Sequence, residues 1–234
     1  MPTRRFHLSM GLVAVAVVVV GFGPGFASAH RNAPVTPLIG LHGAVFSAWL
    51  LLYLVQASLV ATHRVSVHRR LGLAGLALAP AMIITGYATS IAMARRGFDV
   101  SGDLAVEGDP LGALVFPLGD LVSFAVLVAA ALWFRRRPDI HKRLMLLATV
   151  GALMAAPLAH MLGRLPALRD TPPVILIPLA MLYLSGAIYD KLTSGRFHPV
   201  SLWGGVVLLV WAQARAAVVG PSDAWHAFTA WLVR

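Results

Sequence analysis

The stretch that decides the fold runs from Leu41 to Gly72 and reads LHGAVFSAWLLLYLVQASLVATHRVSVHRRLG. A long apolar centre is flanked by His42 at one edge and by His63 and His68 at the other. An apolar helix of about 20 residues crosses the roughly 30 Å hydrocarbon core of a bilayer. The stretch therefore predicts a membrane span, a basic turn and the start of a returning span.

The whole chain repeats this pattern. Of its 234 residues 59% are hydrophobic and only 12% are charged, whereas soluble domains average about 25% charged residues. Hydrocarbon offers no hydrogen bonds, so each apolar run must satisfy its own backbone as a helix. We predict an all-α membrane protein with about seven transmembrane helices, at residues 8–26, 38–61, 71–94, 111–134, 144–162, 173–189 and 200–219.

The formal net charge of +10 does not indicate nucleic-acid binding. The cations cluster between apolar runs, which is the distribution that sets the topology of a membrane protein. Twelve of the 19 Lys and Arg residues fall on the side of the N-terminus and seven on the other side. The positive-inside rule then predicts a multi-pass protein of the bacterial inner membrane with a cytoplasmic N-terminus. The absence of cysteine excludes disulfides, thiolate metal sites and iron–sulfur clusters.

Three regions are expected along the chain. Residues 1–29 are a first span or a cleavable signal peptide, since a basic start and an apolar centre precede Gly-Pro-Gly and Ala27-Ser28-Ala29. Residues 30–220 form a polytopic membrane domain. Residues 221–234 form a short C-terminal interfacial segment.

A short internal repeat organises the predicted spans. HRRLG at 68–72 and HKRLM at 141–145 each open a helix that returns from the basic side. Spans 2–3 and 4–5 are then two parallel copies of one hairpin, related by an axis along the membrane normal. We predict a central four-helix bundle of spans 2–5, with spans 1, 6 and 7 outside it and His68 facing His141.

Four histidines are candidate cofactor ligands. His42 and His160 are expected near one membrane face, and His68 and His141 near the other. Imidazole is the usual ligand for haem, zinc or copper where cysteine is absent. Two such pairs would suit a carrier with two haems. The alternative is that these histidines are simply solvated, or contact lipid phosphates, in the interface.

Asp120 and Arg215 are the intramembrane polar residues. Asp120 lies about nine residues into its predicted span, where an isolated acid is costly. One reading is a buried bond to Arg215 or a histidine that fixes helix packing. The others are a proton relay, a metal ligand, or a carboxylate that orients a ligating histidine. We expect Asp120 to share an outer pocket with His42 and His160, and count it as the only acid within the membrane.

The block HGAVFSAWLLL followed by HRRLGLAGLALAPAMIITGY resembles the cytochrome b561-type membrane proteins over residues 41–90. The resemblance implies b-type haem between four helices and electron transfer across the membrane, with His42 and His68 at matching positions. The whole chain resembles bacterial multi-spanning membrane proteins of uncharacterised activity that carry HG, HRRLG and HKRLM blocks, a likeness that implies no activity.

The sequence therefore predicts an integral membrane protein whose leading chemistry is b-type haem or metal binding in electron transfer. The alternative is a transporter or an assembly and packing subunit without a cofactor, and a lipid-directed enzyme ranks third. The sequence contains no H-E-x-x-H, G-x-S-x-G or P-loop motif, so it names no catalytic residue. The expected partner is the lipid bilayer; substrate, protein partners and oligomeric state stay open.

Overall fold

The computed structural model describes residues 2–27, 33–104, 108–165 and 172–234, which contain helices and turns only. Six helical segments are long and apolar enough to cross a membrane. The helices are α1 (Pro2–Ala27), α2 (Pro37–Ala61), α3 (Val65–Arg96), α4 (Pro110–Ala113), α5 (Val115–Trp133), α6 (Pro138–Leu146), α7 (Ala155–Gly163), α9 (Leu176–Ser194), α10 (Pro199–Ala214) and α11 (Asp223–Leu232). π-Helical turns, Leu147–Gly151 and Arg215–Val219, extend α6 and α10.

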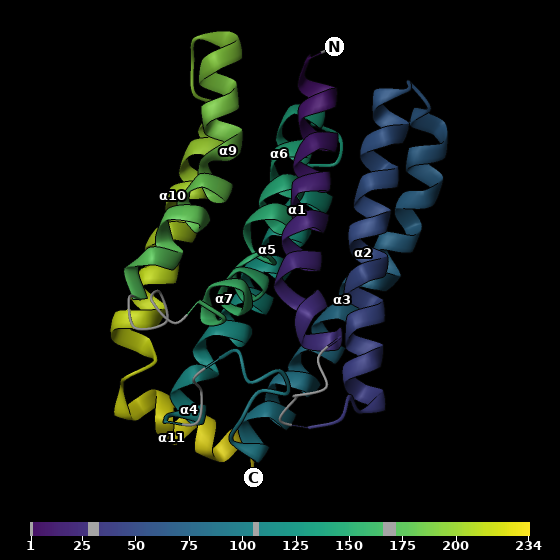
Figure 1. Ribbon diagram of the computed structural model, residues 1–234. Helices are drawn as coiled ribbons and strands as arrows, with labels where there is room; N and C mark the ends of the chain where they lie inside the picture. The colour runs from purple at the N-terminus through teal and green to yellow at the C-terminus, as the bar shows by residue number, and fades with distance from the viewer. Residues whose placement is uncertain (1, 28–32, 105–107, 166–171) are drawn as a thin grey trace.

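The long helices run side by side between two ends of the bundle (Figure 1). The chain N-terminus, the α2–α3 turn and the α9–α10 turn lie at one end, called here the N-terminal end. Helices α4 and α11 lie at the other, called the α11 end. The predicted sixth span corresponds to α9, which is not one of the six candidates because Asp190 and Lys191 lower its mean hydropathy.

The fifth predicted span is the centre of the molecule. Within Pro138–Gly163, 56% of the apolar window is buried, against 17–33% in the other five candidate spans. The window joins three hydrophobic clusters, through Ala148 towards α2, α3 and α5, through Val150 towards α1 and α2, and through Leu147 towards α9 and α10. A helix that is surrounded by other helices on all sides must present apolar residues on every face.

The predicted four-helix core of spans 2–5 forms one cluster that contains no described residue of α1, and α1 packs on its outside through a second cluster. Ala14 of α1 is 0% exposed, and a Cβ on Gly21 would lie 2.4 Å from the backbone oxygen of Pro157 in α7. Small residues allow helix axes to approach closely in membranes. They let α1 pack against both α2 and α7. Superposition of the two hairpins stays a prediction.

Candidate functional site

The structure brings His68 and His141 together at the N-terminal end of the bundle. Their ring centroids lie 6.5 Å apart with planes inclined at 75°. His68 is on the first turn of α3, and His141 is on the first turn of α6. This agrees with the proximity expected from the repeated HRRLG and HKRLM blocks.

Hydrogen bonding fixes the state of one of these rings. His141 Nδ1 lies 2.8 Å from the carbonyl oxygen of Ala131, and a carbonyl only accepts, so Nδ1 carries a proton. In the neutral ring Nε2 then has a free lone pair, which is the arrangement common in metal-ligating histidines. His68 Nδ1 is buried and has no hydrogen-bond partner within the described residues. A buried polar atom without a partner costs free energy, which a bound group could recover.

The separation of the rings fits two ligands on one metal. A metal about 2.0–2.1 Å from each ligating nitrogen, with each nitrogen about 1.1 Å from its ring centre, sets two opposed centroids about 6.3 Å apart. The observed 6.5 Å matches this value. No cluster of three or more His, Asp or Glu suited to a metal occurs in the described ranges. The two histidines alone therefore supply at most two protein ligands at this place.

An apolar groove lies between α3 and α5 beside this pair. It has a volume of about 280 Å³ and is lined by apolar residues: Leu76, Ala79, Pro80, Ile83, Phe124, Ala125, Val128, Ala129 and Leu132. Leu132 directly follows Ala131, the partner of His141, and Leu76 lies eight residues, about 12 Å, beyond His68 on α3. Neither histidine lines the groove itself.

His42 and His160, the second predicted pair, each have other neighbours. His42 packs on Phe46 with ring centroids 4.2 Å apart, while His160 Nδ1 lies 3.3 Å from Asp103 Oδ2. Asp120 pairs with Arg215 instead of either. One pocket shared by His42, Asp120 and His160 stays a prediction, while the contacts found for these residues are with other partners. Similar depth along a helix does not fix the direction in which a side chain points.

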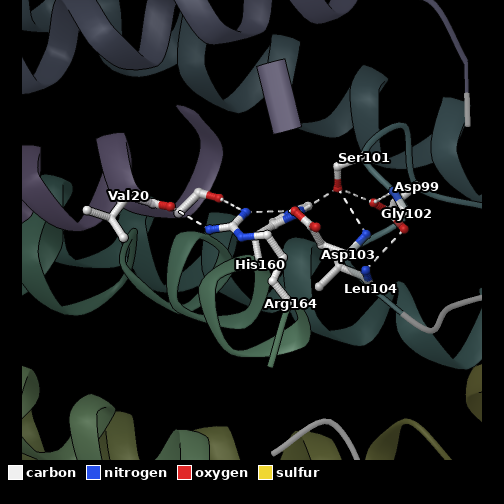
Figure 2. Close-up of polar contacts among 9 residues, drawn as sticks. Val20, Asp99, Ser101, Gly102, Asp103, Leu104, His160 and Arg164 are labelled. Atoms are coloured by element: carbon white, nitrogen blue, oxygen red, sulfur yellow. Dashed lines mark hydrogen bonds and ion pairs between the residues drawn. The ribbon is translucent and has the colours of Figure 1, made fainter. Parts of the chain in front are cut away.

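His160 belongs to a polar cluster that closes the α3–α4 loop at the α11 end (Figure 2). Asp103 Oδ2 accepts a bond from Arg164 Nη1 at 2.9 Å and lies beside His160. Ser101 Oγ donates to Asp99 Oδ2 at 2.5 Å. Arg164 also donates to the carbonyls of Val20 and Gly21 in α1. Sequence analysis missed this cluster because loop residues are brought to α7 only by the fold.

Ser101, His160 and Asp103 have the residue types of a hydrolase triad but not its geometry. Ser101 Oγ lies 3.1 Å and Asp103 Oδ2 3.3 Å from the same ring atom, His160 Nδ1. A triad needs the serine on one ring nitrogen and the acid on the other, so that the imidazole can accept the serine proton. Arg164 already pairs with Asp103, so the cluster is suited to holding a loop in place.

Asp120 forms the buried ion pair with Arg215 that was one reading of the sequence. Arg215 Nη1 lies 2.7 Å from Asp120 Oδ1 and also donates to the carbonyl of Phe116 at 2.8 Å. The two side chains are 13% and 4% exposed. A Cβ on Gly119 would lie 2.3 Å from Arg215 Cδ, so a glycine makes room for the guanidinium. The pair joins α5 to the π-helical end of α10.

A second buried acid, Asp190, lies in α9 one residue beyond the predicted sixth span. Arg143 reaches both Asp190 oxygens, at 2.5 and 3.0 Å, and Ser201 Oγ donates to Asp190 Oδ2 at 2.7 Å. Asp190 was missed because the predicted span ended at residue 189, whereas α9 continues to Ser194. Its bonds join α6, α9 and α10.

At the α11 end, His226 and Asp109 form an exposed ion pair. His226 Nε2 lies 3.0 Å from both Asp109 oxygens, and its Nδ1 donates to the carbonyl of Ser222 at 2.9 Å. The Ser222 carbonyl, followed by Asp109, raises the pKa of His226 above its ordinary value. The Gly112 backbone N–H, followed by His226, lowers the pKa of Asp109.

These features define the class: an all-α protein with six candidate membrane-spanning helices and polar clusters between them. Comparison of the chain with models of known protein families, with curated protein sequences and with solved structures finds no match. The function is therefore argued from the geometry of the chain itself.

Proposed function

We propose that this chain is a seven-span protein of the bacterial inner membrane that binds one b-type haem through His68 and His141 and takes part in electron transfer. The observation that carries the proposal is the 6.5 Å separation of the two rings, which come from different helical hairpins. The bonded Nδ1 of His141 and the buried, unpaired Nδ1 of His68 support it.

The surroundings suit haem better than a bare ion. Haem needs only two axial ligands from the protein, it has an apolar edge, and its propionates are anionic. The apolar groove between α3 and α5 has the same apolar character as the edge of a haem. The exposed Arg64, Arg69 and Arg70 near His68 provide positive charge. When bound, the group would supply one-electron chemistry, and the protein would set its potential through burial and the Ala131 bond to His141.

The test is reconstitution of the purified full-length protein with haemin in detergent. A Soret band typical of two axial imidazoles is expected at one haem per chain, and His68→Ala and His141→Ala should each abolish it. His198→Ala is the matched control, because His198 lies at the same end but pairs with Asp139 at 3.6 Å. Equal spectra in the wild type and both ligand variants would refute the proposal, and the same variants titrated with Zn²⁺ or Cu²⁺ would reveal a bare-metal site.

The second candidate is an assembly and packing subunit without cofactor. The ion pairs Asp120–Arg215 and Arg143–Asp190 favour it, because each joins helices far apart in sequence. If haem does not bind, loss of stability in the ion-pair variants would be the remaining phenotype.

A further inference from the structure

The outward face of α11 is apolar although the helix lies across one end of the bundle (Figure 1). Residues at positions i, i+3, i+4 and i+7 share one face of a helix. In α11 that face holds Ala224, Ala227, Phe228 and Trp231, all exposed, with Phe228 at 45% and Trp231 at 64%. Their rings are neighbours, with centroids 6.1 Å apart. We call these four residues the aromatic stripe.

A second face of α11, about 120° around the helix from the stripe, holds the helix against the bundle. Thr229 is 0% exposed, and Trp225 Nε1 donates to the carbonyl of Leu111 at 3.2 Å. Arg95 of α3 donates from Nε to the carbonyl of Val233 at 2.8 Å. The helix is thus fixed on the spans with its aromatic stripe turned away from them.

The position of the stripe identifies what covers it. The candidate span Pro199–Val219 ends with Val218 67% exposed, and α11 begins at Asp223 after a short turn. The stripe therefore begins within a few residues of the end of that span's apolar surface. Trp and Phe are favoured at this depth, and the exposed Arg95 and Arg234 suit lipid phosphates.

We propose that the aromatic stripe of α11 lies in the membrane interface and contacts the headgroup–acyl boundary of the leaflet at the α11 end. This rests on the membrane-spanning part of the proposed function, and it gives the predicted interfacial segment 221–234 a defined lipid-facing surface. The helix would anchor the bundle at one depth, as amphipathic helices do in peripheral proteins.

The cysteine-free chain allows single nitroxide labels to test this. Ala227→Cys and Ala224→Cys would be labelled in the full protein, reconstituted in vesicles of phosphatidylethanolamine and phosphatidylglycerol. Collisions with oxygen, which enters the bilayer, would be compared with those of a water-soluble nickel chelate. We expect both labels to collide more often with oxygen than Ser66→Cys on the α2–α3 side, and less often than Val207→Cys within α10.

Each outcome is decisive. A stripe label as accessible to the nickel chelate as Ser66→Cys faces water, which overturns the proposal. A label shielded from both reagents is covered by a protein or a second copy, which also overturns it. A water-accessible Val207→Cys would instead show that α10 does not span, so failure of the proposed topology is distinguishable from failure of the stripe.

Discussion

At the scale of the residue, Asp120 and Arg215 show how charge is tolerated inside an apolar bundle. Each neutralises the other at 2.7 Å, and the Phe116 carbonyl accepts a further bond. Removing one partner leaves an uncompensated buried charge, whereas removing both does not. We predict that Asp120→Asn or Arg215→Met lowers the free energy of unfolding by about 3–5 kcal/mol. The double variant Asp120→Leu/Arg215→Met should recover most of the loss.

Unfolding of the purified variants in mixed micelles, followed by circular dichroism, measures this effect. Arg135→Met is the control, because Arg135 is exposed and its Nη1 bonds only the nearby Leu132 carbonyl. If the double variant is as unstable as the sum of the two single ones, the pair does not act as a unit.

The exposed pair of His226 and Asp109 should make α11 docking depend on pH. The pKa of His226 is raised, so its contribution is complete below the ordinary histidine pKa and is lost as pH rises through the raised value. The pKa of Asp109 is lowered, so its contribution is lost only as pH falls through that lowered value. We predict that a label at Ala227→Cys becomes more mobile above neutral pH and again in strong acid.

The matched variant for this prediction is His226→Gln, which keeps a donor but does not titrate in this range. Its label mobility should not change on the alkaline side. Asp223, which also raises the pKa of His226, would be kept in both proteins. An unchanged alkaline transition in His226→Gln would mean that another group controls docking.

At the scale of the element, Pro24 and Arg164 form a complementary pair. A proline within a helix has no N–H for the carbonyl four residues earlier. For Pro24 of α1 that carbonyl belongs to Val20, and Arg164 of α7 donates to it and to the Gly21 carbonyl. Because Pro24 lacks an N–H, the Val20 carbonyl of α1 is left free to accept the bond that Arg164 donates from the end of α7.

A double-mutant cycle tests this relation. Pro24→Ala restores a helical donor for Val20, so Arg164→Met should destabilise the protein less in the Pro24→Ala background than in the wild type. A coupling of about 1 kcal/mol is expected, within the usual range for contacting residues. The cycle also separates this contact from the Arg164–Asp103 bond, which both backgrounds share. Equal effects in the two backgrounds would contradict the prediction.

The sequence predicted helices well because apolar length alone defines them. The sequence also predicted that His68 lies near His141, because repeated blocks are expected to place equivalent residues around one axis. It did not give the neighbours of His42 and His160, because residue number indicates depth but the direction of a side chain depends on packing. The bonds of Arg164 to the Val20 and Gly21 carbonyls could not be predicted from the sequence, because they depend on the close approach of α1 to α7 that the small residues between them allow.

At the scale of the whole molecule, the direction of α9 decides the topology. Helices α9 and α10 run side by side, and their turn lies at the same end as the α2–α3 turn (Figure 1). Gly205 fits against α9 so closely that a Cβ there would lie 2.5 Å from the Tyr183 carbonyl oxygen. Because α10 is a candidate span and α9 packs along it, we predict that α9 crosses as well, with Asp190 bonded to Arg143 and Lys191 bonded to the Gly195 carbonyl.

This arrangement predicts that Ser194→Cys and Ser66→Cys react with a membrane-impermeant maleimide from the same side, and Gly108→Cys from the other. The positive-inside rule, applied to the twelve of 19 Lys and Arg residues on that side, predicts that the first two lie on the cytoplasmic side. Intact cells should therefore label only Gly108→Cys, and inverted vesicles only Ser194→Cys and Ser66→Cys. Labelling of all three after permeabilisation confirms that each thiol is reactive. If Ser194→Cys instead reacts together with Gly108→Cys, α9 does not cross, and the chain has six spans with α10 entering from the opposite side.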